Sequence, residues 1–122
     1  MKPNIISEKS VAFAINMIKV YQSIVKAHNE YILSKQFLRS STAIGALVKE
    51  AEHAQSTPDF IHKMHIALKE ANETEYWLLL LNKGGYLSDE EHTIYTQDAS
   101  ELIRILASIV KTTKLNLKDA KK

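Results

Sequence analysis

The chain has 122 residues, of which 45% are hydrophobic and 25% are charged, a composition typical of one globular domain. It contains no cysteine, which excludes a disulfide framework, a thiolate metal site and a cysteine nucleophile. The 16 basic and 14 acidic residues give a net charge of +2, so overall charge alone does not require a nucleic-acid partner. Only 3 glycines and 2 prolines are present, which favours long helices over an all-β fold.

Nothing in the sequence directs the chain to a membrane. The longest apolar run is Tyr76–Leu81, whereas a membrane-spanning helix needs about 20 apolar residues. The first ten residues, MKPNIISEKS, lack the apolar centre of a signal peptide. We therefore expect a cytoplasmic protein.

The first predicted helix runs from about Ser7 to His28, and Asn29 is suited to a left-handed stop. Its apolar residues form two stripes, both with helical steps of three and four. The first stripe comprises Val11, Ala14, Ile18, Tyr21 and Val25. The second stripe comprises Phe13, Met17, Val20 and Ile24.

The second predicted helix begins at Ser34, a possible N-cap, and continues to about Ala54. Small residues are frequent in its first half, from Ser40 to Ala46. Gly45 costs about 1 kcal/mol relative to alanine inside a helix. A close contact with another helix would explain the glycine at this position.

The third and fourth predicted helices carry clear boundary signals. Thr57 is predicted to cap the third helix, with Pro58 at its first position, and a glycine of the pair Gly84-Gly85 is predicted to supply a left-handed residue at its end. The sequence Ser88-Asp-Glu-Glu91 predicts a capping box that opens the fourth helix. This helix is expected to fray beyond Leu115, which gives a bundle domain over residues 1–117 and a disordered basic tail over 118–122.

Short connections make successive helices antiparallel. The predicted fold is therefore all-α, an antiparallel up-down-up-down four-helix bundle. The sequence leaves open a bundle of the opposite hand or one with a crossover connection.

Several segments also carry a family resemblance. They are QFLRSSTAIGALVKEA from Gln36, the pair Asp59-Phe60, IALKEA from Ile66, EYWLLLL from Glu75 and GYLS from Gly85. In this order and spacing they resemble the four-helix-bundle proteins encoded in intervening sequences of bacterial 23S rRNA genes. That family includes the accessory variability protein of diversity-generating retroelements. The resemblance covers about residues 8–110, and the chain departs from it at Leu47-Val48-Lys49, where the family usually has Asn-Ile-Glu/Ala.

The resemblance implies a homopentameric bundle without enzymatic activity. For the retroelement branch it also implies binding to nucleic acid and to a reverse transcriptase. These properties are expectations that come from the family alone.

The residues themselves predict neither a metal site nor an enzyme. Glu50-x-x-His53 and Asp59-x-x-His62 resemble the pairs of di-iron bundles, but the first helix has no inward Glu at mid-height. No glycine-rich phosphate loop follows a strand, and nothing brings a serine, a histidine and an acid together. We expect no cofactor and no metal.

Two ion pairs are predicted from the hairpin of the second and third helices. Arg39 and Glu75 lie at equal distances from its turn, among small and apolar residues. A buried charge needs a partner, so these two are predicted to form a buried pair. By the same register, Glu50 is predicted to pair with Lys63 at the surface.

The apolar surface of the chain exceeds what one bundle face can cover. The run Tyr76–Leu81 is apolar all round the helix, and the first helix has two apolar stripes. Either the segment Tyr31–Leu33 covers the run, or the chain forms an oligomer. The residues predicted at a subunit interface are Phe13, Met17, Val20, Ile24, Trp77, Leu80 and Leu81.

The segment from Arg104 to Lys122 contains six basic residues and one acidic residue, a net charge of +5. Within it, Lys111, Lys114 and Lys118 share one helical face and are candidates for phosphate contact. Lysines in a last helical turn also simply complement the helix dipole. A second candidate set lies on the first helix and comprises Lys9, Lys19 and Lys26.

Two function classes follow. The leading hypothesis is a non-enzymatic oligomeric bundle that binds RNA, DNA or a nucleic-acid-processing protein. The alternative is a structural or regulatory protein-interaction module that contacts no nucleic acid. Salt-sensitive retention on RNA would separate the two.

Overall fold

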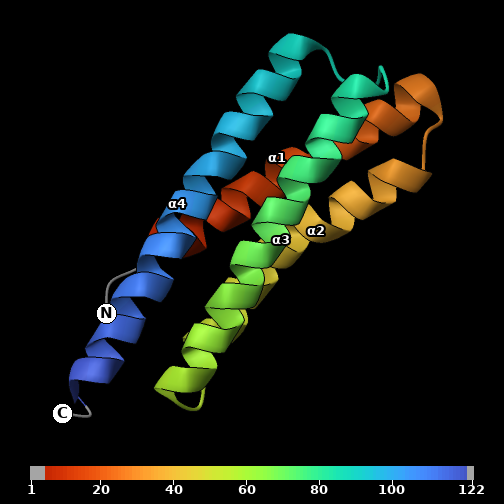
Figure 1. Cartoon of the computed structure of the whole chain (residues 1–122). Helices are drawn as coiled ribbons and strands as arrows, with labels where there is room; N and C mark the ends of the chain where they lie inside the picture. The colour runs from red at the N-terminus through yellow and green to blue at the C-terminus, as the bar shows by residue number, and fades with distance from the viewer. Residues whose placement is uncertain (1–4, 121–122) are drawn as a thin grey trace.

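The computed structural model describes residues 5–120; residues 1–4 and 121–122, which fall in the predicted domain and tail, lie outside the described residues. Four helices and no strand occur in the described range (Figure 1). They are α1 (Ile5–His28), α2 (Ile32–Glu52), α3 (Thr57–Lys83) and α4 (Asp89–Ala120). The chain reverses direction at each connection, which confirms the predicted all-α four-helix bundle.

The four helices do not pack equally. The α2–α3 and α3–α4 contacts are extensive, whereas α1 and α4 make the smallest contact of the bundle. Figure 1 shows α1 crossing α4 at an angle, so the two helices diverge toward the α1–α2 connection. Two clefts lie between these helices, one lined in part by Val20 and Tyr95 and the other by Phe13 and Leu102.

A carboxylate, not a serine, starts α2. Glu30 accepts hydrogen bonds from the backbone N–H groups of Ile32, Leu33 and Ser34, each at 2.9 Å. The hydroxyl of Ser34 also donates to Glu30, at 2.7 Å. The helix consequently begins at Ile32, two residues before the predicted start at Ser34. Asn29 has a φ of 53°, which confirms the predicted left-handed stop of α1.

Local signals also set the other boundaries. Ser56 caps α3 by accepting from the N–H of Asp59 at 3.2 Å, one residue before the predicted cap. Of the two glycines predicted to end this helix, Gly85 is the left-handed one, with a φ of 91°, whereas Gly84 is right-handed. Ser88 and Glu91 form the predicted capping box, with reciprocal bonds of 2.9 and 3.1 Å. The last helix, α4, continues to Ala120, three residues past the predicted domain end.

The core combines large apolar side chains with a seam of small polar ones. Phe37, Met17 and Leu78 are fully buried at its centre. The buried hydroxyls of Ser40 and Thr74 join α2 to α3 through a 3.0 Å hydrogen bond. Gly45 lies against α1, but a Cβ there would stand 3.4 Å from the Ser10 hydroxyl, an ordinary contact, so the approach of α1 does not require a glycine. The small residues of α2 thus let neighbouring helices approach closely.

Candidate functional site

The predicted buried pair between Arg39 and Glu75 is wrong. Arg39 instead binds Glu73 at 2.7 Å and Glu70 at 3.3 Å, and half of its side chain is exposed. Glu75 accepts a 2.7 Å hydrogen bond from the Ser100 hydroxyl and so links α3 to α4. Arg39 and Glu75 do lie at similar distances from the α2–α3 turn. However, Glu75 faces α4, whereas Arg39 contacts the side of α3 that carries Glu70 and Glu73.

The Arg39 cluster also holds a tryptophan. Trp77 donates its ring N–H to Glu73 at 3.1 Å. This bond lowers the pKa of Glu73; burial opposes the shift, and Arg39 reinforces it. The carboxylates of Glu73 and then Glu70 raise the pKa of Arg39. The charged forms of Arg39 and Glu73 are therefore favoured, and the hydrogen bond to Glu73 fixes the position of the Trp77 ring.

The second predicted ion pair is confirmed. Lys63 lies 3.6 Å from Glu50, and both side chains are partly exposed, 30% and 57% respectively. Such a pair contributes little to stability.

The predicted subunit interface is wrong for most of its residues. Phe13, Met17, Val20 and Ile24 are at most 6% exposed because this stripe of α1 faces the chain's own core. Leu81 is fully buried there as well. The remaining two residues, Trp77 and Leu80, are half-buried.

A different face of α1 is free. Val11, Ile15 and Ile18 are 48%, 51% and 39% exposed. We call these three residues the α1 outer face. The first stripe contained two of them, whereas Ile15 belonged to neither stripe. Its spacing of four from Val11 and three from Ile18 was the signal that could have found it.

The candidate phosphate-binding lysines lie at the end of α4. Lys111, Lys114 and Lys118 are all exposed and follow Val110, the last buried residue of this helix. We call them the α4 lysines. In the second candidate set, Lys9 is already paired with Glu101 at 3.0 Å.

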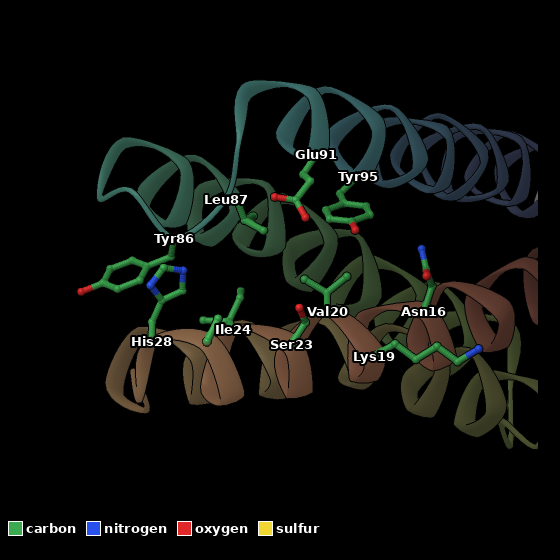
Figure 2. Close-up of a pocket in the computed structure, with 11 residues that line it drawn as sticks. Asn16, Lys19, Val20, Ser23, Ile24, His28, Tyr86, Leu87, Glu91 and Tyr95 are labelled. Atoms are coloured by element: carbon green, nitrogen blue, oxygen red, sulfur yellow. The ribbon is translucent and has the colours of Figure 1, made fainter.

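A cleft of about 330 Å³ opens between α1 and α4 (Figure 2). Figure 2 shows Glu91 and Tyr95 pointing from α4 toward Val20 and Ser23 of α1. Burial, and then the charges of Glu91 and Asp98, raise the pKa of Tyr95.

The rings of His28 and Tyr86 lie at one end of this cleft. They pack edge to face, with their centroids 5.2 Å apart. Its floor is apolar, with Ile24 and Leu87 buried, and its polar groups lie at the rims.

A more apolar cavity of about 520 Å³ lies near the α2–α3 turn. Its lining includes Ile6, Val48, Phe60, Met64 and Ile109. Within residues 5–120 no group of three histidine, aspartate or glutamate side chains is placed to hold a metal ion. The same range contains no helix that is long and apolar enough to cross a membrane.

Comparison with solved structures and protein families supports this fold. The chain can be superposed on the crystal structure of a protein of unknown function from the S23 ribosomal protein family of Bacteroides thetaiotaomicron, with a TM-score of 0.86 and 47% sequence identity. The alignment covers 88% of this chain and 99% of that one. Comparison with curated proteins gives no match. The profile of the 23S rRNA-intervening sequence proteins matches residues 2–108, so the chain belongs to this family.

Proposed function

We propose that this protein is a non-enzymatic homo-oligomeric bundle, a pentamer by family resemblance, that binds the phosphates of RNA or DNA. The observation that carries the proposal is the position of the α4 lysines. They lie on exposed turns of α4 that contribute no buried residue to the core. Side chains that the core does not need are available for a ligand.

The chemistry of these lysines suits phosphate better than base edges. A lysine ammonium is a point charge on a flexible stem, whereas base recognition favours planar, bidentate groups. The steps of three and four place the ammonium groups along one side of α4. Binding through this side should therefore depend little on nucleotide sequence.

Oligomerisation would strengthen this binding. One chain has a net charge of only +2, but each copy in an assembly adds another set of α4 lysines. The α1 outer face gives a reason to assemble, because three adjacent, exposed aliphatic side chains lie on one helix. An assembly that covers this face would present several basic segments to one nucleic acid.

The experiment replaces Lys111, Lys114 and Lys118 together by glutamine and measures binding to RNA and duplex DNA over a range of salt concentrations. The unaltered chain should lose affinity steeply with salt, with a slope of about −0.9 per phosphate on a duplex and −0.7 on a single strand. The triple variant should show a flatter slope and an unchanged oligomer mass. A slope that is identical in both proteins would place the contact elsewhere.

The α1 outer face also favours a second candidate function. Exposed aliphatic residues are typical of protein–protein interfaces, so the bundle would be an interaction module for another polypeptide, such as a nucleic-acid-processing enzyme. This module would show no salt-sensitive retention on RNA. Mutation of the α1 outer face would abolish its partner binding, whereas mutation of the α4 lysines would not.

A further inference from the structure

The outward side of α3 carries a regular row of side chains that the core does not use. His62, Lys69, Tyr76 and Lys83 are spaced seven residues apart and are all exposed. We call these four residues the α3 row. Seven residues are about two helical turns, or roughly 10 Å along the axis, so the row lies on one side of the helix.

The row is free of acidic residues, and its lysines are available. Within residues 5–120 neither Lys69 nor Lys83 forms an ion pair. The acids nearest to Lys69 along α3 are Glu70 and Glu73. Arg39 contacts both carboxylates, and Glu73 also accepts a hydrogen bond from Trp77. The ammonium groups of Lys69 and Lys83 are therefore available to contact a polyanion.

An aromatic ring lies midway between the two lysines. Tyr76 is 53% exposed, although large aromatic rings are usually buried. Its ring meets that of Trp77 edge to face, with the centroids 5.2 Å apart. The hydrogen bond to Glu73 holds Trp77, so the Tyr76 ring packs against a fixed neighbour while about half of its surface stays exposed.

We propose that the α3 row binds single-stranded nucleic acid, with a base stacked on Tyr76 and phosphates on either side contacting Lys69 and Lys83. Stacking on an exposed ring is tolerant of sequence, because every base has a π face. The bases of a duplex are paired and stacked on each other, so an exposed ring selects unpaired strands. This inference rests on the proposed nucleic-acid binding and adds a preference that the α4 lysines cannot supply.

The chain contains a reporter for this contact. Trp77 is its only tryptophan and touches Tyr76, so a base stacked there should change the tryptophan fluorescence. The first measurement titrates the full chain with a short single-stranded RNA and with the same sequence as a duplex. The single strand should quench or shift the emission, whereas the duplex should bind without this change. Equal changes with both ligands would overturn the proposal.

The second measurement compares affinities by fluorescence anisotropy of a labelled single strand. Tyr76→Ala should weaken binding by about 5- to 150-fold, the usual loss for one stacked base. Tyr76→Phe keeps the ring and should retain the affinity. The matched control is Ile94→Ala, because Ile94 is equally exposed (55%) but lies on α4. This control should bind as the unaltered chain does.

The outcomes separate this proposal from the broader function. If Tyr76→Ala binds the single strand unchanged while the α4 triple variant loses affinity, the α3 row is wrong and the proposed function stands. If the unaltered chain binds neither RNA nor DNA at low salt, both are wrong. If Tyr76→Ala changes the oligomer mass, the row is a contact between copies, and the proposal is again overturned.

Discussion

Arg39 forms its two ion pairs at the surface of the α2–α3 hairpin, and exposure limits what they contribute. Removing one partner of a buried pair costs about 3–5 kcal/mol, whereas exposed pairs contribute about 0.2–1 kcal/mol. Arg39→Ala should therefore lower the free energy of unfolding by about 1 kcal/mol. Chemical denaturation of the variant measures this loss.

A double-mutant cycle identifies the partner. Arg39→Ala and Glu73→Ala should show a coupling energy that shrinks as salt is added. Arg39→Ala and Glu75→Ala should add independently, because Glu75 is bonded to Ser100. Coupling with Glu75 instead of Glu73 would contradict the structure.

Glu30 makes stability depend on pH. Burial raises the pKa of Glu30, but the hydrogen bonds from the hydroxyl and N–H of Ser34 and the N–H groups of Leu33 and Ile32 outweigh it and lower the value below 4.5. A lowered pKa means that the stabilisation is present above about pH 4.5 and is lost as the pH falls through the value in the folded protein.

Glu30→Ala should therefore lower the free energy of unfolding by about 1 kcal/mol at neutral pH, as other capping mutations do. The difference from the unaltered chain should close on acidification. The control is Glu52→Ala, an exposed acid at the opposite end of α2. A difference that is the same at neutral and acidic pH would show that the carboxylate charge is not the cause.

At the scale of helices, substitutions of Gly45 test how closely α1 and α2 pack against each other. A Cβ at this position would meet the Ser10 hydroxyl and carbonyl at 3.4 and 3.5 Å, which is ordinary contact. Gly45→Ala should then stabilise the protein by up to about 1 kcal/mol through helix propensity. Gly45→Val should destabilise it, because its added methyl groups extend toward Ser10. Thermal melting of the two variants should give shifts of opposite sign.

Most helix boundaries could be predicted from sequence because their causes are local. The left-handed Asn29 and Gly85 and the Ser88–Glu91 box each involve residues within one helical turn. The start of α2 could not be predicted from serine preferences, because the cap is a glutamate two residues outside the helix.

The interactions between helices were harder to predict. The hairpin register predicts how far Arg39 lies from the turn, but not the direction in which its side chain points around the helix axis. The register therefore predicts a pair with Glu75, whereas the structure has pairs with Glu70 and Glu73. Both stripes of α1 are apolar and periodic, and only tertiary packing shows that Phe13 faces inward while Val11 faces outward.

At the scale of the whole molecule, the proposed assembly places the α1 outer face in the contact between copies. Ile15→Asp places a charge at the centre of this face, where burial against another copy would be costly. The variant should keep its helical content, because Ile15 is half exposed in the single chain, but its mass by light scattering should fall. Ile94→Asp is the matched control on α4 and should leave the mass unchanged. An unaltered mass for Ile15→Asp would exclude this face as the subunit contact.

The most direct test of a nucleic-acid-binding assembly is sedimentation of the full chain with a short labelled RNA, at low and at high salt. The protein should sediment at a multiple of its 13.8 kDa chain mass, fivefold if it is a pentamer. The RNA should co-sediment with it at low salt and be released at high salt. A protein that sediments at 13.8 kDa while the RNA remains free at low salt would contradict both the assembly and the binding.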